Sequence, residues 1–390
     1  MSEVRVNNLS NENNTGGPTI SGITTYSGTN FFVPPQGDTA SRPSSCPNGS
    51  LRFNTDSAKL EYYRGDTIGW SEIEAELTAP LGGGTGSNTG LGTRAILMGG
   101  LKNQQPSPVA TDEIDFYTIS TLGNTQDFGN LSTALYGGSM SGTVASRTRG
   151  FLGGASPNPG NNIIEKLQIA TTGSSVNFAD MQKTRYTNAN HSNQTRGLFM
   201  GGYVTPAYDS QIDYFTMATQ ADAIDFGDVD VNTGFNAGGG NTTRALLLGG
   251  VNMIAEVKGV TIQTLGNTQD FGNLANPRNG SPAGCSSSTR VLVAGGNLQP
   301  SNSKTANIEV YTTVTNGQAV SFGSLTASRS YGLGGCGDHV RATFGGGYTP
   351  TQVDIVDFVQ FSTGGDAVDF GDLQSVKRGC TAVSSAHGGL

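Results

Sequence analysis

Short apolar runs separated by glycine and small polar residues recur along residues 91–390. One run in each period begins with Thr-Arg, or with Val-Arg in the sixth, and ends in a glycine pair, as in TRAILMGG at 93–100, TRGLFMGG at 195–202 and TRALLLGG at 243–250. A second run alternates apolar and polar residues, and a third contains a Phe-Gly step. Runs of four to eight residues bounded by turn residues are typical of β-strands. The pattern predicts an all-β region in which each period supplies four short strands.

The period is close to 48 residues and occurs six times. The arginines that open the apolar runs are Arg94, Arg149, Arg196, Arg244, Arg290 and Arg341. The second marker keeps the same spacing at Phe128, Phe178, Phe226, Phe271, Phe322 and Phe370. Four strands in a period of this length are typical of a β-propeller blade. We therefore expect one six-bladed β-propeller over residues 93–390.

The two ends of the repeat predict how this propeller closes. The strand at 94–98 has no convincing partner before it, because GGGTGSNTGLG is rich in turn residues. The last period stops where a further Thr-Arg strand would begin. We expect a C-terminal strand at about 379–387 to pair with 94–98 and complete the first blade, which would hide two sheet edges.

The periods resemble kelch repeats, the blades of galactose-oxidase-type propellers. The resemblance covers about 300 residues and rests on the glycine pair, an acidic-aromatic strand such as Ile114–Tyr117 or Ile212–Phe215, and an arginine near the unit end. These unit-end arginines are Arg185, Arg278, Arg329 and Arg378. The usual tryptophan of the fourth strand is replaced by Phe-Gly. The resemblance implies a fold and does not specify an activity.

Residues 1–80 lie outside the repeat. Prolines at 34, 35, 43 and 47 predict an extended connector. The alternation in GSLRFNTDSAKLEYYRGDTIGWSEI, 49–73, predicts a β-hairpin and a third short strand with Trp70. So small a sheet is marginal alone, and we expect it to pack on a partner or on another copy of itself. The glycine-rich segment 81–92 is interpreted as a hinge before the propeller.

The stretch from Gly49 to Trp70 resembles a module of tailed-phage virion proteins, particularly fibre and appendage proteins of marine phages, including cyanophages. The resemblance rests on the pattern G-S-L-R-F-N-T-D-x-x-x-L-E-Y-Y-x-G, followed by tryptophan. It implies a non-enzymatic bacteriophage structural protein, a tail-fibre, baseplate-appendage or host-attachment component, bound to other virion proteins through residues 1–80 and homo-oligomeric in the particle. Alternatives are a capsid-surface decoration or fibre protein, or a glycan-active enzyme on a propeller scaffold.

Composition narrows these classes. The net charge is −8 and the chain has no cluster of Lys and Arg, so nucleic acid is not an expected partner. No apolar run approaches the length of a membrane span, and the polar N-terminus lacks a signal-peptide profile. We expect a protein made in the host cytoplasm and located in the virion, without membrane insertion. The four cysteines form no C-x-x-C pair and are expected to be small buried strand residues.

The repeated arginines are interpreted as structural, with an anion-binding ring as the alternative. Acids occur in the third strand of most units, and an arginine-carboxylate pair between adjacent strands would fix the register. These acids are Asp115, Glu165, Asp213, Glu309 and Asp357. In the fourth unit Lys258 takes the acid's place, with Glu256 nearby.

No catalytic, cofactor or metal site is predicted. His191, His339 and His387 precede the Thr-Arg step and are expected in turns on the broad rim of the propeller. The Asp-rich turns lack calcium-loop spacing, and the glycine cluster at 82–92 lacks the flanking strand and helix of a nucleotide loop.

The loops after each glycine pair vary most, and variable loops on a rigid scaffold are a usual place for recognition. Tyr203, Tyr208 and Tyr348 are candidate ligand-facing residues that would stack on a host surface glycan or contact another receptor. The alternative is that these are plain solvated loops.

Overall fold

The computed structural model describes residues 34–57, 59–72, 93–102, 107–137, 141–156 and 161–389. Within these ranges the chain is all-β, with many small antiparallel sheets and one short 3-10 helix, η1 (His387–Gly389). It divides into two compact units, Met1–Ala75 and Glu76–Leu390. The expected glycine hinge at 81–92 lies outside the described residues.

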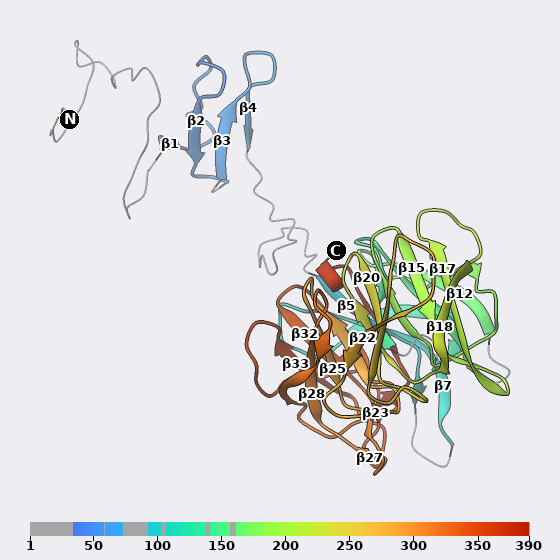
Figure 1. Ribbon diagram of the computed structural model, residues 1–390. Helices are drawn as coiled ribbons and strands as arrows, with labels where there is room; N and C mark the ends of the chain where they lie inside the picture. The colour runs from blue at the N-terminus through green and yellow to red at the C-terminus, as the bar shows by residue number, and fades with distance from the viewer. Residues whose placement is uncertain are drawn as a thin grey trace, which may run out of the picture. The chain divides into compact units, whose positions relative to one another are not determined.

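The first unit is one sheet in the order β1-β2-β3-β4 (Figure 1). Its strands are β1 (Gln36–Gly37), β2 (Leu51–Asn54), β3 (Lys59–Tyr63) and β4 (Trp70–Glu72). The hairpin pairs Leu51 with Tyr62 and Phe53 with Leu60, so the hairpin and third strand predicted over 49–73 are confirmed. β1 adds a short parallel edge beside β2.

The second unit contains six groups of four antiparallel strands, here called sheets 1 to 6. Sheet 1 is β36 (Thr381–Ser384), β5 (Arg94–Met98), β7 (Val109–Thr118) and β8 (Gln126–Leu135). Sheet 2 is β10 (Val144–Ala145), β11 (Arg149–Ala155), β12 (Asn161–Gln168) and β13 (Val176–Asp180), and sheet 3 is β14 (Ala189–Ser192), β15 (Arg196–Met200), β17 (Ala207–Thr216) and β18 (Ile224–Thr233). Sheet 4 is β19 (Ala237–Gly240), β20 (Arg244–Leu248), β21 (Glu256–Thr261) and β22 (Gln269–Asn273). Sheet 5 is β24 (Ala283–Ser286), β25 (Arg290–Ala294), β28 (Asn307–Thr312) and β30 (Val320–Ser324), and sheet 6 is β31 (Gly334–Gly337), β32 (Arg341–Gly345), β33 (Ile355–Gln360) and β34 (Val368–Asp372).

Short additional strands join these sheets at their margins. They are β6 (Leu101–Lys102), β9 (Ser141–Gly142), β16 (Tyr203–Val204), β23 (Arg278–Asn279), β26 (Asn297–Leu298), β27 (Ser303–Lys304), β29 (Gly317–Gln318) and β35 (Lys377–Arg378).

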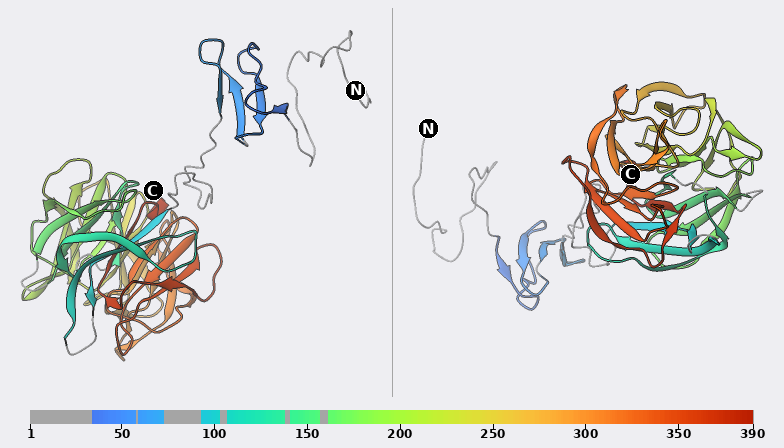
Figure 2. Two further views of the ribbon diagram at one scale, coloured as in Figure 1. Left: turned by 180° about the vertical axis from the view of Figure 1, so that it is seen from behind. Right: turned by 90° about the horizontal axis from the view of Figure 1, so that it is seen from below.

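The C-terminal strand belongs to the first sheet. β36 pairs antiparallel with β5, from Thr381 opposite Met98 to Ser384 opposite Ala95. The predicted pairing of about 379–387 with 94–98 is therefore confirmed. Figure 2 (right) shows the first and last segments of the unit side by side. The colours pass round the unit from cyan through green, yellow and orange to red, which lies beside cyan.

Apolar side chains fill the space between successive sheets, and the last layer lies between sheet 6 and sheet 1. That layer joins Leu97 and Tyr117 of sheet 1 to Val356 and Phe370 of sheet 6. Because both faces of each sheet are covered, the second strands are continuous apolar runs rather than alternating ones. The residues after the leading arginine in β5, β15, β20 and β25 are all buried.

The Phe-Gly marker reflects a close passage of two backbones. The N–H of Gly123, in the turn before β8, donates to the carbonyl of Phe370 in β34 (2.9 Å). At Gly371, with φ of +148°, a Cβ would lie 2.5 Å from the oxygen of Gly123. Glycine is required there because a side chain would meet the neighbouring turn.

The segments that lead from one sheet to the next are linked to one another by backbone hydrogen bonds. The N–H groups of Gly137, Thr187, Phe235, Ser281, Tyr331 and Gly379 donate respectively to the oxygens of Gly379, Gly137, Thr187, Phe235, Gly280 and Tyr331. The series returns to its start, so the six connections form a closed circle of polar groups that satisfy each other.

Candidate functional site

The third-strand acids are paired across the boundaries between sheets. Arg185, at the end of the second period, forms an ion pair with Asp213 of sheet 3, and both side chains are completely buried. It also donates to the carbonyls of Gly201 (3.0 Å) and Gln211 (2.7 Å). The same arrangement recurs in Arg278–Glu309, Arg329–Asp357 and Lys377–Asp115. The unit-end cation thus joins each of these sheets to the preceding connection.

This finding corrects the expected pairing of acids with the arginines of the Thr-Arg step. Arg196 does not contact Asp213; it donates to the carbonyls of Ile262 and Gln263, just after β21 of sheet 4 (3.0 Å each). Its guanidinium also lies 4.9 Å from the ring centroid of Tyr214. The contacts of this kind from each sheet to the next are Arg94 to Ile169, Arg149 to Met217, Arg196 to Ile262, Arg244 to Thr313, Arg290 to Phe361 and Arg341 to Ile119.

In the last period the unit-end cation is Lys377 and not the expected Arg378. Lys377 is the completely buried residue that pairs with Asp115, and burial raises the pKa of that carboxyl despite the nearby ammonium. Arg378 is half-buried, and its guanidinium lies 4.7 Å from the ring centroid of Tyr348.

The two sheet boundaries without a basic residue have different chemistry. Before sheet 2 the corresponding position is Leu135, and Glu165 instead accepts hydrogen bonds from the hydroxyls of Ser132 and Ser175. Before sheet 4 it is Thr233, and Lys258 replaces the acid. Lys258 pairs with Asp230 (2.9 Å) and Glu256 (3.3 Å). Each acid is present only where a donor reaches it, which is the arrangement expected of structural ion pairs.

The space enclosed by the first strands is occupied by the chain itself. β10, β14, β19, β24, β31 and β36 neighbour each other in a closed series, and β9 lies against five of them. Thr143, directly after β9, donates to the carbonyl of Gly335 in sheet 6 (3.5 Å). η1 lies against β24, and Gly388 lies close to the ring of His191.

Two of the three histidines meet in this enclosed space. The rings of His191, in β14, and His387, in η1, have centroids 5.4 Å apart. Their expected location in turns on the rim is wrong, because β14 continues through His191 and the C-terminal segment turns inward after β36. His339 lies in the turn between β31 and β32, as expected.

The buried histidines are held neutral. Burial lowers the pKa of His191 to about 3, helped by the neighbouring His387, and lowers the pKa of His387 to about 4. Nε2 of His387 lies 2.9 Å from Oγ of Ser192, and its Nδ1 lies 3.2 Å from the carbonyl oxygen of Ser384. Ser192 has no exposed surface, so a substrate cannot reach this Ser-His contact.

The candidate ligand-facing tyrosines fall into two separate clusters of half-buried rings. Tyr203 lies with Tyr186 and Tyr208, each pair with centroids 5.3 Å apart. Burial raises the pKa of Tyr186 and of Tyr208. Tyr348 lies instead beside Tyr331, with centroids 6.0 Å apart. The structure therefore brings Tyr203 and Tyr208 together and keeps Tyr348 apart from them.

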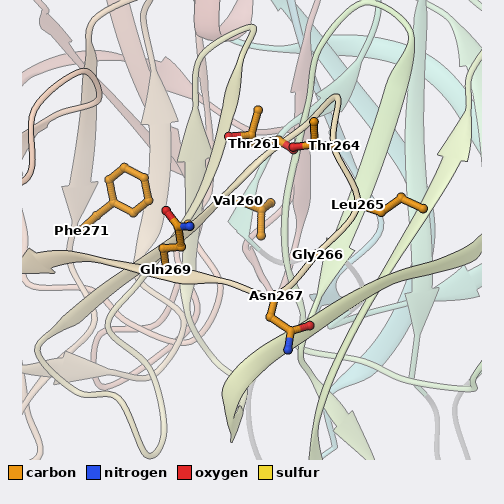
Figure 3. A pocket seen from close by; sticks show the side chains of 9 residues that line it. Val260, Thr261, Thr264, Leu265, Gly266, Asn267, Gln269 and Phe271 are labelled. Carbon is orange, nitrogen blue, oxygen red and sulfur yellow. The ribbon is translucent and has the colours of Figure 1, made fainter.

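A cavity of about 250 Å³ opens beside β21 and β22 (Figure 3). Thr261 borders it at the end of β21, Thr264 and Leu265 border it on the turn between the two strands, and Gln269 and Phe271 border it on β22. All of its lining side chains are uncharged, so it offers contacts but no acid, base or nucleophile.

The buried face of the first unit combines a polar network with the rings of Tyr63 and Trp70. Glu61 has no exposed side-chain surface and pairs with Arg42 (2.6 Å) and Arg52 (3.3 Å). Asn54 donates to Glu61 at 3.3 Å. Nε1 of Trp70 donates to the carbonyl of Pro43 (2.9 Å), which ties the segment before β2 to β4. Arg52, Asn54 and Glu61 of the 49–70 pattern thus form one polar network with Arg42.

Cys285 and Cys336 are buried strand residues, as expected, and burial raises the pKa of Cys336 to about 12. Cys380 is buried just before β36, whereas Cys46 is half-buried and outside any strand, so the expectation is wrong for Cys46. The described residues contain no group of three His, Cys, Asp or Glu side chains placed to hold a metal ion. They also contain no helix long and apolar enough to cross a bilayer. No protein-family model matches the chain, and no curated protein matches it significantly.

Proposed function

We propose that this chain is a non-enzymatic structural protein of a bacteriophage particle, a tail-fibre, baseplate-appendage or host-attachment component. In this proposal residues 93–390 form a six-bladed kelch-like β-propeller that is displayed by the particle, and residues 1–80 attach it to other virion proteins. The wider propeller class is supported by six four-stranded sheets in cyclic order and by the β36–β5 pairing.

One observation carries the structural role more than any other. The centre of the second unit, where a propeller would present a channel, holds β9 and η1 of the chain itself. The third-strand acids are engaged at sheet boundaries, as in Arg185–Asp213 and Arg329–Asp357. A glycan-active enzyme would need carboxylates that converge on bound substrate, whereas these carboxylates are occupied by structural partners.

The attachment role of the first unit rests on its sequence pattern and its size. A four-stranded sheet with a charged interior buries little apolar surface and is expected to rely on association. The loops with Tyr203, Tyr208 and Tyr348 are the proposed contacts to a host surface glycan or receptor, because half-buried tyrosines combine a large apolar ring with a polar group.

Mass spectrometry of purified particles, separated into heads and tails, tests this proposal. Peptides of this chain in the tail fraction at a fixed copy number are the expected result. Peptides in the head fraction would favour the capsid-decoration alternative. Absence from both fractions would refute a virion role altogether.

A further inference from the structure

In the hairpin of the first unit, charged and polar side chains are buried, whereas apolar side chains are exposed on the opposite face. Arg52, Asn54 and Glu61 point to the buried side, where the segment before β2 covers them. The other face of the same two strands carries Leu51, Phe53, Leu60 and Tyr62. Leu51 and Leu60 are 42% and 37% exposed, and the two aromatic side chains are half-buried.

The apolar face is therefore not used to fold the unit that carries it. The ionic network around Glu61 and the contacts of Trp70 already join β2, β3 and β4 to the covering segment. Apolar residues placed outward on the two central strands of so small a sheet are the usual sign of a surface that becomes buried in an assembly. The four side chains are here called the outward stripe.

We propose that the outward stripe is a self-association surface whose occupant is the outward stripe of a second copy of this chain. This inference deepens the attachment role proposed for residues 1–80 and rests on it. It assigns the stripe to contacts between copies, so that contacts with other virion proteins would use other parts of the segment.

The pattern of the stripe favours a second copy. Cross-strand neighbours are Leu51 with Tyr62 and Phe53 with Leu60, so aromatic and aliphatic side chains alternate in both directions. When two such faces meet across a two-fold axis, each aromatic ring can lie over an aliphatic side chain of the other face. Such self-complementarity is what an isologous contact requires, and alternation of large and small residues lets facing layers interdigitate.

The charge distribution supports the same occupant. The other strand residues paired beside the stripe are Gln36, beside Phe53, and Ser71, beside Tyr62, and both are uncharged. A partner with a charged patch would find no complement there. Two copies of a chain with a net charge of −8 repel each other overall, and a charge-free face allows contact without adding close repulsion.

The test uses the full chain and sedimentation velocity over a range of concentrations. Wild-type protein is expected to show reversible association, and the double variant Leu51→Ser with Leu60→Ser should associate at least about 100-fold more weakly. Ile68→Ser is the matched control, because Ile68 is 57% exposed but lies in the turn before β4, outside the stripe. This control should associate like wild type.

Trp70 separates loss of association from loss of folding. It is the only tryptophan of the chain and packs on the buried side of the sheet against Tyr63 (5.4 Å between ring centroids). Its emission spectrum should therefore be the same in wild type and in the double variant at concentrations where both are monomeric.

A monomeric wild-type chain throughout the concentration range would overturn the inference, as would unchanged association of the folded double variant. A double variant with altered Trp70 emission is replaced by Phe53→Thr with Tyr62→Thr, which keeps β-branched residues on the strands and must meet the same criteria. If the self-association inference is refuted, the proposed virion role is not affected, because that role is tested by the composition of purified particles. A chain that associates through the stripe but is absent from particles would instead refute the virion role alone.

Discussion

Replacing Arg185 by alanine should destabilise the second unit strongly. The guanidinium is completely buried and is the ion-pair partner of Asp213, which is also completely buried. Removal would leave Asp213 with the backbone N–H of Gln182 (3.1 Å) and the amide of Gln211 (2.9 Å) and without a counter-charge. Two carbonyls, those of Gly201 and Gln211, would also lose a donor.

The magnitude follows from these contacts. Breaking a buried ion pair by removing one partner costs about 3–5 kcal/mol, which for a unit of this size corresponds to a fall in Tm on the order of 5–8 °C. Arg196→Ala is the informative comparison. Arg196 is half-buried, donates to two carbonyls and lies over Tyr214. Its loss should cost only about 1–2 kcal/mol.

Equilibrium urea unfolding followed by far-UV circular dichroism measures both costs, since Trp70 reports only on the first unit. Arg185→Lys is a useful third variant, because the Lys377–Asp115 pair performs the same role at another boundary. It should lie between wild type and Arg185→Ala. An Arg196→Ala cost equal to or above that of Arg185→Ala would refute the assignment of the acids to unit-end cations.

Three other variants test separate features. Deletion of residues 379–390 removes β36 and exposes the edge of β5, so the truncated chain should aggregate or lose its cooperative transition on heating; an unchanged calorimetric melt would refute closure by this strand. Gly371→Ala should cost at least about 1 kcal/mol more than Gly365→Ala in urea unfolding, because both have φ near +150° but only Gly371 would set a Cβ against the Gly123 backbone; equal costs would show that strain alone matters. His191 and His387 have folded pKa values of about 3 and about 4, below the ordinary 6.5, so the unfolded chain binds their protons first and stability is lost as pH falls below about 6.5. Each contributes a loss of about 2 kcal/mol at pH 5, and His191→Gln should reduce the difference in unfolding free energy between pH 7.5 and pH 5 by roughly that amount; a variant with the wild-type difference would contradict burial of this ring.

The strands of the second unit could be predicted because their signal is local. The glycine pair, the apolar run and Phe-Gly each mark a strand or turn within a few residues, and β15, β17 and β18 lie where the pattern expected strands. The pairing of the C-terminal strand followed from counting repeats. Neither prediction required knowledge of which sheets are neighbours.

The predicted partners of the charged residues were wrong because these contacts are not local in the sequence. Register alone brings an arginine and an acid to adjacent strands, but side chains alternate between the two faces of a sheet, and the acids face the preceding connection. A signal was present in the sequence. The unit that follows Arg185, Arg278 or Arg329 has an acid in its third strand, whereas the unit that follows Thr233 has Lys258. The meeting of His191 and His387 had no comparable signal, because it depends on the inward path of the last residues.

The unequal chemistry of the sheet boundaries has a consequence for folding. The segment TLGNTQDFGNL occurs unchanged at 121–131 and 264–274, in sheets 1 and 4, and identical segments invite exchange during folding. Asp115 of sheet 1 and Lys258 of sheet 4 lie at the same position beside these copies, opposite Asp127 and Asp270. If sheets 1 and 4 exchanged places, Asp115 would be buried without Lys377, and Lys258 would lie beside Lys377. The opposite charges of Asp115 and Lys258 thus disfavour an exchange of sheets 1 and 4 during folding.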